Sequence, residues 1–155
     1  MEKNPETIIS ELGLELPSAP KPMGVYKPVL ISGNLLYVSG TGPIKSDGSL
    51  IKGRVGDNLT PEEGKSAAQQ AGLAMLAIIK ANIGDLNRIG RIVKTFGMVN
   101  SVPEFDQHPA VINGFSELMA KVFGPDNGIG VRSAVGMILP SGMAVEIEAV
   151  FELKD

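Results

Sequence analysis

Arg132 is the charged residue of this sequence that is best suited to bind a ligand. It lies in the run VRSAVGMIL, among small and apolar residues that predict a β-strand. A planar guanidinium can bind a carboxylate through two parallel hydrogen bonds, so an arginine held in such a strand would suit an anionic ligand. A solvated position at a sheet edge explains the same residue, and from the residues alone it is the favoured interpretation.

The last predicted strand carries two glutamates on one face. Apolar and charged side chains alternate over residues 144–153, so Glu146 and Glu148 project to the same side. Paired carboxyls can carry out general acid–base chemistry. The solvent-exposed face of an amphipathic strand also explains the pattern and is preferred from the residues alone. His108 is interpreted first as a polar residue in the first turn of a helix and only second as a catalyst.

The composition excludes several other chemistries. The 155 residues include no cysteine and one histidine, which excludes disulfide scaffolds, thiol nucleophiles, zinc fingers and multi-histidine metal centres. A net charge of −3 and an aromatic content of 5% disfavour binding to nucleic acid. The acidic N-terminus lacks the features of a signal peptide, and the apolar run LAMLAII is too short for a membrane span. We therefore expect a soluble cytoplasmic protein with no membrane partner.

Residues 1–22 are interpreted as an addition to a domain that spans residues 23–155. Asn4 followed by Pro5 predicts the start of a helix, which should end near Gly13. Three prolines in ELPSAPKP then predict an extended connector.

The main domain is predicted to be α+β, with the order ββαβαββ. Strands are expected over residues 25–31, 35–39, 90–100, 131–138 and 144–153, and helices over about 60–82 and 106–123. The loop between residues 40 and 58 is expected to hold a minor β-ribbon around Asp47 and Gly48, and the last two strands to form a hairpin through Pro140. Small residues on one face of the first long helix, such as Gly64 and Gly72, predict a close approach to the sheet.

Both helices can cover the same face of this sheet. The opposite face would remain uncovered in a single chain, so we expect the protein to form oligomers through its sheet.

Residues 23–153 resemble the Rid/YjgF family of reactive-intermediate deaminases, also known as L-PSP endoribonuclease-like proteins. The most specific match is the run RSAVGMILPSGMAVEIEAVF. The segments MGVY, LLYVSGTGP, LTPEEGKSAAQQAGLAMLAIIK and VINGF follow the family's order and spacing. The chain resembles a longer subgroup with an N-terminal extension.

The resemblance implies a chorismate-mutase-like fold, with a single mixed sheet, two helices on one face and a homotrimeric assembly whose sites lie at subunit interfaces. It also implies hydrolysis of 2-imino and enamine acids to 2-oxo acids and ammonia, with no metal or organic cofactor. Small-molecule 2-imino and 2-oxo acids are the expected partners, and nucleic acid is not expected.

Six residues correspond by position to site residues of the family. Arg132 would bind the substrate carboxylate, and Glu146 would lie near the hydrolytic water. The expected site-lining residues are Tyr26, Ser39, Gly40 and Asn113. Two positions depart from many relatives: Ala134 stands in place of a cysteine and Thr41 in place of a glutamine. These departures do not change the expected class of reaction, but they leave the identity of the substrate open.

The expected final hairpin constrains the two catalytic candidates. It would place Arg132 opposite residues 148–150, with Glu146 roughly 10 Å further along at ~3.4 Å per residue. We therefore expect Glu146 to reach the ligand of Arg132 from a neighbouring subunit, or to act through water.

Two other functions share parts of this pattern. A non-catalytic trimer that binds small carboxylates, as a sensor or a regulatory protein, would use Arg132 in the same way. An endoribonuclease or translation inhibitor, as the family's older name suggests, is disfavoured by the acidic net charge, the few aromatics and the single histidine.

Overall fold

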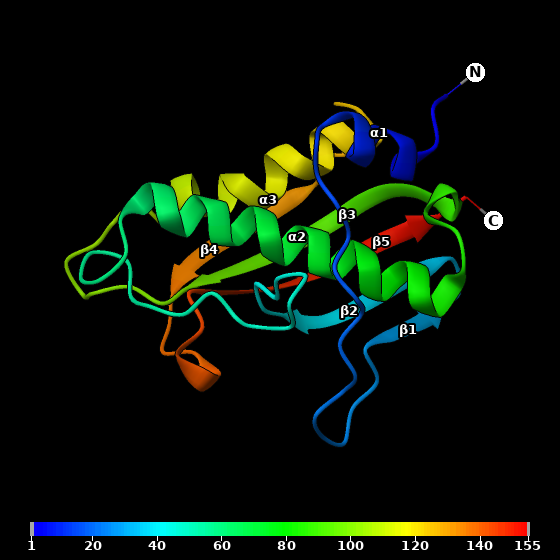
Figure 1. Ribbon diagram of the computed structural model, residues 1–155. Coiled ribbons are helices and arrows are strands. Elements are labelled where there is room, and N and C mark those ends of the chain that lie inside the picture. Colours follow the sequence, from blue (N-terminus) through cyan, green and yellow to red (C-terminus); the bar gives the residue numbers. More distant parts are fainter. Residues whose placement is uncertain (1, 155) are drawn as a thin grey trace.

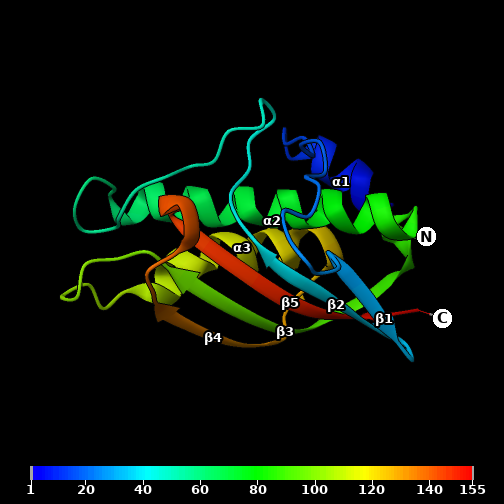
Figure 2. The same cartoon turned by 90° about the horizontal axis from the view of Figure 1, so that it is seen from below.

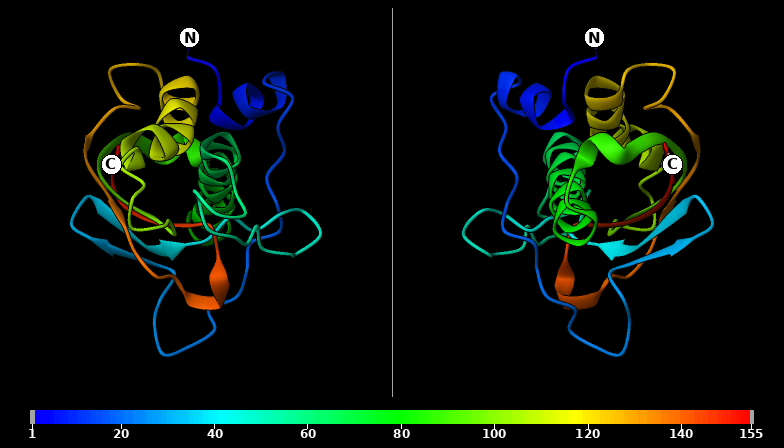
Figure 3. Two further views of the ribbon diagram at one scale, coloured as in Figure 1. Left: turned by 90° about the vertical axis from the view of Figure 1, so that its left-hand side faces the viewer. Right: turned by 90° about the vertical axis from the view of Figure 1, so that its right-hand side faces the viewer.

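Two long helices lie side by side on one face of a mixed five-stranded sheet (Figure 1). The computed structural model describes residues 2–154. The long helices are α2 (Pro61–Ile83) and α3 (His108–Phe123). Across the sheet the order is β1 (Val29–Ser32), β2 (Leu35–Thr41), β5 (Val145–Leu153), β3 (Ile89–Val99) and β4 (Val131–Gly136) (Figure 2). Two short 3₁₀ turns, Leu86–Arg88 and Pro140–Gly142, precede β3 and β5. The predicted single mixed sheet, with both helices on one face, is confirmed (Figure 3).

The predicted N-terminal helix is present as α1 (Pro5–Glu11). The Asn4 side chain caps it by accepting a hydrogen bond from the backbone N–H of Glu6. Ile9 is buried in the same apolar core as the long helices, and Glu6 forms an ion pair with Lys80 near the end of α2. The helix is therefore attached to the body of the protein through both apolar and ionic contacts.

Strands β1 and β2 form the predicted antiparallel hairpin, in which Gly33 takes a positive φ of 63° at the turn. The loop after β2 contains the predicted small ribbon, an antiparallel bridge between Ile44 and Leu50 around Asp47 and Gly48. Helix α2 begins with the predicted capping box, in which Thr60 and Glu63 exchange hydrogen bonds.

The expectation that Gly64 and Gly72 of α2 approach the sheet is wrong. Gly64 lies against Val55 in the loop and Val111 of α3, and Gly72 faces α3. A Cβ added to Gly72 would lie 2.9 Å from Leu118 and 3.2 Å from Phe115, both on α3. In return, a Cβ added to Gly114 of α3 would lie 2.0 Å from the backbone oxygen of Lys65 on α2. The glycines thus permit close packing of two helices whose other sides must both reach the sheet.

The predicted hairpin between the last two strands is also wrong. Strand β4 pairs in parallel with β3, whereas β5 lies between β2 and β3 and pairs with both in antiparallel register. The physical reason is helix α3, which carries the chain back across the sheet between β3 and β4. A strand that follows such a crossover lies parallel to the strand before it.

No layer formed by residues 2–154 packs over the sheet face opposite the helices. Leu30, Tyr37 and Val131 are each exposed by 44% or more on or beside this face. The turn around residues 137–143 and the loop around residues 20–28 extend from this side (Figure 3). This exposed face could accommodate a second copy of the chain, and association through the sheet remains a prediction.

We expect Gly114→Ala to destabilise the protein by about 2–3 kcal/mol, because the new methyl group would overlap the backbone of α2 and separate the helices. Chemical unfolding measures the change. The control is Glu117, which is exposed on the same helix. At this position the Glu117→Ala protein should have a free energy of unfolding about 1 kcal/mol higher than the Glu117→Gly protein. A Gly114→Ala protein at least as stable as the parent would contradict the proposed close packing.

Candidate functional site

Arg132 is held between the edge strand of the sheet and helix α3. It pairs with Thr95 of β3, which in turn pairs with Ala149 of β5, and both of these neighbours are buried beneath the helices. The guanidinium Nη1 donates to Asn113 Oδ1 at 2.8 Å and to Ser116 Oγ at 3.2 Å, both on α3. The side chain of Arg132 therefore projects from the helix-covered face of the sheet.

The two hydrogen-bond acceptors that contact Arg132 are neutral. Across residues 2–154, no carboxylate oxygen lies within 4.0 Å of its guanidinium. A hollow of about 320 Å³ lies beside it, lined in part by Thr95, Gly130 and Glu117, whose carboxylate pairs with Lys65. An anionic group could therefore bind here without first displacing an internal ion pair.

Glu146 lies on the other face of the sheet, beside an irregularity in β2. Regular pairing between β2 and β5 is interrupted between Val38 and Thr41, so Ser39 and Gly40 bulge against β5. A Cβ on Gly40 would lie 3.0 Å from the Glu146 carboxyl, so a larger residue at this position would crowd that side chain.

The surroundings of Glu146 are mostly apolar. It pairs with Met98 across the sheet and borders a hollow of about 770 Å³ that Phe96 and Met143 also line. Burial and, to a smaller extent, the negative charge of Glu148 raise the pKa of Glu146 above its ordinary value. Glu148 is exposed, as expected for the solvent face of an amphipathic strand, whereas Glu146 is half-buried.

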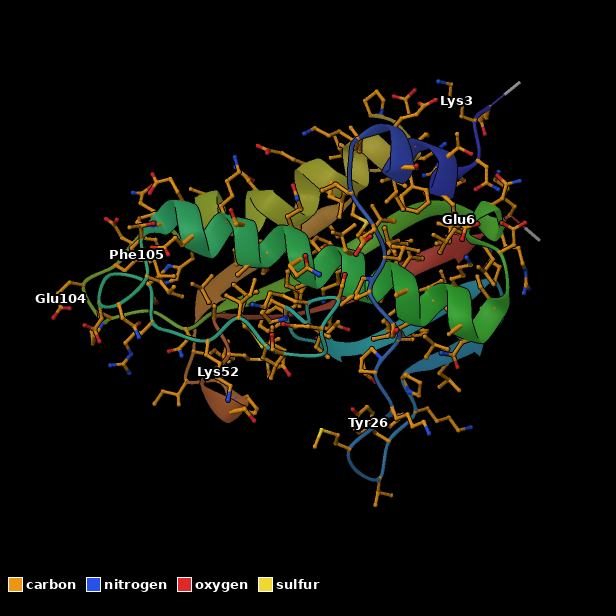
Figure 4. The ribbon with its side chains drawn as sticks, viewed as in Figure 1. Lys3, Glu6, Tyr26, Lys52, Glu104 and Phe105 are labelled. Atoms are coloured by element: carbon orange, nitrogen blue, oxygen red, sulfur yellow. The ribbon has the colours of Figure 1, made fainter. Side chains whose placement is uncertain are left out.

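Tyr26 and Ser39 border the same hollow as Glu146. Ser39 Oγ donates to the carbonyl of Lys27 at 2.6 Å, which fastens the preceding loop to the start of the bulge. Tyr26 lies on that loop, which extends away from the body of the protein (Figure 4), and its side chain is 51% exposed. Its hydroxyl oxygen accepts a hydrogen bond from the backbone N–H of Met23 at 3.4 Å.

The six predicted residues thus form two groups. Arg132 and Asn113 lie on the helix-covered face, whereas Tyr26, Ser39, Gly40 and Glu146 lie on the open face. Within one chain the sheet itself separates the arginine from the glutamate, and the described residues contain no ion pair between them. The expected offset along a shared hairpin is therefore wrong, and the two residues are instead separated by the thickness of the sheet.

Ser116 is a candidate site residue, identified by its contact with Arg132, that the sequence did not reveal. It lies three positions after Asn113 on α3 and therefore on the same helix face. If β4 had been predicted to pair with β3 instead of β5, the spacing of Asn113 and Ser116 would have indicated that both residues contact Arg132. His108 takes the predicted position at the start of α3, where its Nε2 lies 3.0 Å from Ser101 Oγ and its ring packs edge-on against Phe105.

Residues 2–154 contain no group of three or more His, Cys, Asp or Glu side chains placed to hold a metal ion. Within that same range, no helix has the length and apolar character needed to cross a bilayer.

We expect Glu148→Gln to lower the pKa of Glu146 part of the way to its ordinary value. The substitution removes the repulsion between like charges, while burial, the larger cause, remains. Because the raised pKa belongs to the folded state, protonated Glu146 favours folding below its ordinary pKa, and this contribution is lost as the pH rises through the raised value. Carboxyl ¹³C shifts measured against pH report the titration. Glu152→Gln, further along β5, should leave it unchanged.

The sequence and the structure were compared with known proteins. Residues 6–141 match the family described as "YjgF/chorismate mutase-like, putative endoribonuclease". The chain is 40% identical over 148 residues to Protein TCP17 of Trypanosoma cruzi, covering 95% of this chain and 92% of that protein. It is also 26% identical to a RutC family protein of Pyrococcus horikoshii, covering 86% of this chain and 90% of the relative.

Solved structures give the same result. A protein of unknown function from Agrobacterium tumefaciens is 43% identical with a TM-score of 0.89, covering 97% of this chain and 92% of that one. A "putative endoribonuclease" from Shewanella oneidensis is 31% identical with a TM-score of 0.92, covering 97% of this chain and 100% of that one. The expected resemblance to the Rid/YjgF family is confirmed, and the chain belongs to the YjgF/chorismate mutase-like family.

Proposed function

We propose that this protein hydrolyses reactive 2-imino and enamine acids to 2-oxo acids and ammonia. The observation that carries the proposal is the guanidinium of Arg132, which is held in place by Asn113 and Ser116 and has no carboxylate partner among residues 2–154. Such a group can take the carboxylate that every substrate of this class carries.

The reaction needs little more than orientation and one proton transfer. With its carboxylate on Arg132, a 2-imino acid presents its imine carbon to a water molecule near Glu146. The water oxygen bonds to that carbon while Glu146 accepts a proton from the water, and the electron pair of the C=N π bond moves to the nitrogen, which takes a proton from solvent. In the resulting carbinolamine, Glu146 returns its proton to the nitrogen, the C–N bond breaks to release ammonia, and the C=O bond forms as the hydroxyl proton passes to solvent. A raised pKa suits Glu146 to this role, because it moves the carboxyl closer to neutral pH.

The two residues can meet around one substrate only if two copies of the chain supply them. The uncovered sheet face with Glu146 and the sheet edge with Arg132 are both available to a second copy. We therefore propose a homotrimer with one site in each interface, because a contact between unlike surfaces forms a ring when its rotation closes, and the family resemblance implies three subunits.

The relatives named as endoribonucleases make RNA cleavage a function to test. In this chain, Arg132 lies in a small hollow that Glu117 also lines, with neutral hydrogen-bond partners, rather than in an extended basic surface, and the net charge is −3. These features suit a small carboxylate better than a phosphodiester chain.

We expect the protein to suppress semicarbazide trapping of 2-imino acids that an amino acid oxidase generates, and Arg132→Ala to abolish this suppression. Loss of the carboxylate contact removes substrate orientation. Arg91→Ala, an exposed arginine on the neighbouring strand, should retain activity. If the wild-type protein leaves the trapped product unchanged yet binds 2-oxo acids, the non-catalytic carboxylate-binding function replaces this proposal. RNA cleavage that is lost in Arg132→Ala would instead favour the nuclease.

We expect Glu146→Gln to lower kcat by about 10²–10⁴-fold, because it removes the group that accepts the proton. Inactive Arg132→Ala and Glu146→Gln subunits, refolded together, should then regain activity at about one quarter of their sites, since each site takes its two residues from different subunits. Each variant refolded alone is the control. Persistent inactivity of the mixture, with mixed oligomers shown by mass spectrometry, would place both residues in one subunit.

A further inference from the structure

Arg132 is positioned by acceptors that carry no charge. Both of its hydrogen bonds use Nη1, which donates to the amide oxygen of Asn113 and to the hydroxyl of Ser116. The opposite edge of the guanidinium, formed by Nε and Nη2, is an edge that can bind a carboxylate through two parallel hydrogen bonds. The contacts on α3 therefore fix one side of the group and leave its charge to be matched by a ligand.

Helix α3 is well placed to hold this geometry. Phe115 and Leu118, which alternate with Asn113 and Ser116 along the helix, are buried in the core. On its other side α3 lies against α2 so closely that Gly114 has no room for a side chain. The two acceptors therefore cannot move away from Arg132 without disturbing the core.

We propose that Asn113 and Ser116 are positioning residues whose neutrality keeps Arg132 available for the substrate carboxylate. This inference rests on the proposed function and gives a specific role to Asn113, which the family resemblance placed among the site-lining residues. A carboxylate at the same place would hold the arginine equally well, but it would form an internal ion pair. The substrate would then have to compete with that ion pair for the guanidinium.

Asn113→Asp tests the neutrality directly, because it keeps the shape of the side chain and changes its charge. Calorimetric titration with 2-oxobutanoate should show affinity about ten- to a hundredfold weaker than that of the parent protein, the range expected when a charge-assisted contact is lost. Binding of the neutral analogue 2-oxobutanamide should change much less. Ser116→Ala should weaken 2-oxobutanoate binding by up to about tenfold, because one of the two contacts that orient Arg132 is removed.

Lys121→Gln is the matched control, because it also makes the charge of the same helix more negative by one unit, at an exposed position outside the hollow beside Arg132. It should bind 2-oxobutanoate as the parent protein does. Thermal unfolding should show that Asn113→Asp remains folded. Unchanged 2-oxobutanoate affinity in the folded Asn113→Asp protein would overturn the inference, and so would an equal loss for the neutral amide.

The titration separates this inference from the proposed function. If imines are not hydrolysed but Asn113→Asp still weakens 2-oxobutanoate binding selectively, only the catalytic proposal fails. If imines are hydrolysed and the charge at position 113 has no effect on KM or on product affinity, only the positioning role fails.

Discussion

The crossover from β3 through α3 to β4 is the arrangement on which the candidate site depends. It makes β4 the edge strand next to β3 and brings the same helix over the face from which Arg132 projects. An arginine in a half-covered edge strand is expensive to bury unless its donors are satisfied. Asn113 and Ser116 satisfy one nitrogen from the helix that created the crossover, so the same segment determines both the strand position and the polar contacts.

On the open face of the sheet, Glu146 is a carboxyl in mostly apolar surroundings. The carboxyl lies among methionines and a phenylalanine, where ionisation costs more than it does in water. The bulge at Ser39 and Gly40 gives the carboxyl room beside the strand, since a Cβ on Gly40 would lie only 3.0 Å from it. The irregular pairing in β2 therefore helps to determine where the Glu146 side chain on β5 lies.

Local sequence patterns predicted the elements well and their neighbours less well. The capping box at Thr60, the turn at Gly33 and the alternation of β5 depend on residues close together in the chain, and the structure contains all three. The pairing of β4 depends on where α3 returns the chain to the sheet, which is a long-range feature. Because β4 and β5 are close in sequence, a hairpin between them was predicted instead. The same error hid Ser116, because its contact with Arg132 exists only when β4 lies beneath α3. The clustering of Tyr26, Ser39, Gly40 and Glu146 came from the family resemblance, since their separation along the chain gives no local signal.

The sheet geometry also explains why one chain offers two half-sites. Residues that pair across neighbouring strands share a face, so Arg132, Thr95 and Ala149 must lie together beneath the helices. Glu146 is three residues from Ala149 on the same strand, and an odd separation places it on the opposite face. No change of side-chain rotamer brings the two groups together through a packed sheet. A site that uses both residues therefore requires the edge of one sheet to meet the open face of another, and the two surfaces that must meet are the two that this chain leaves uncovered.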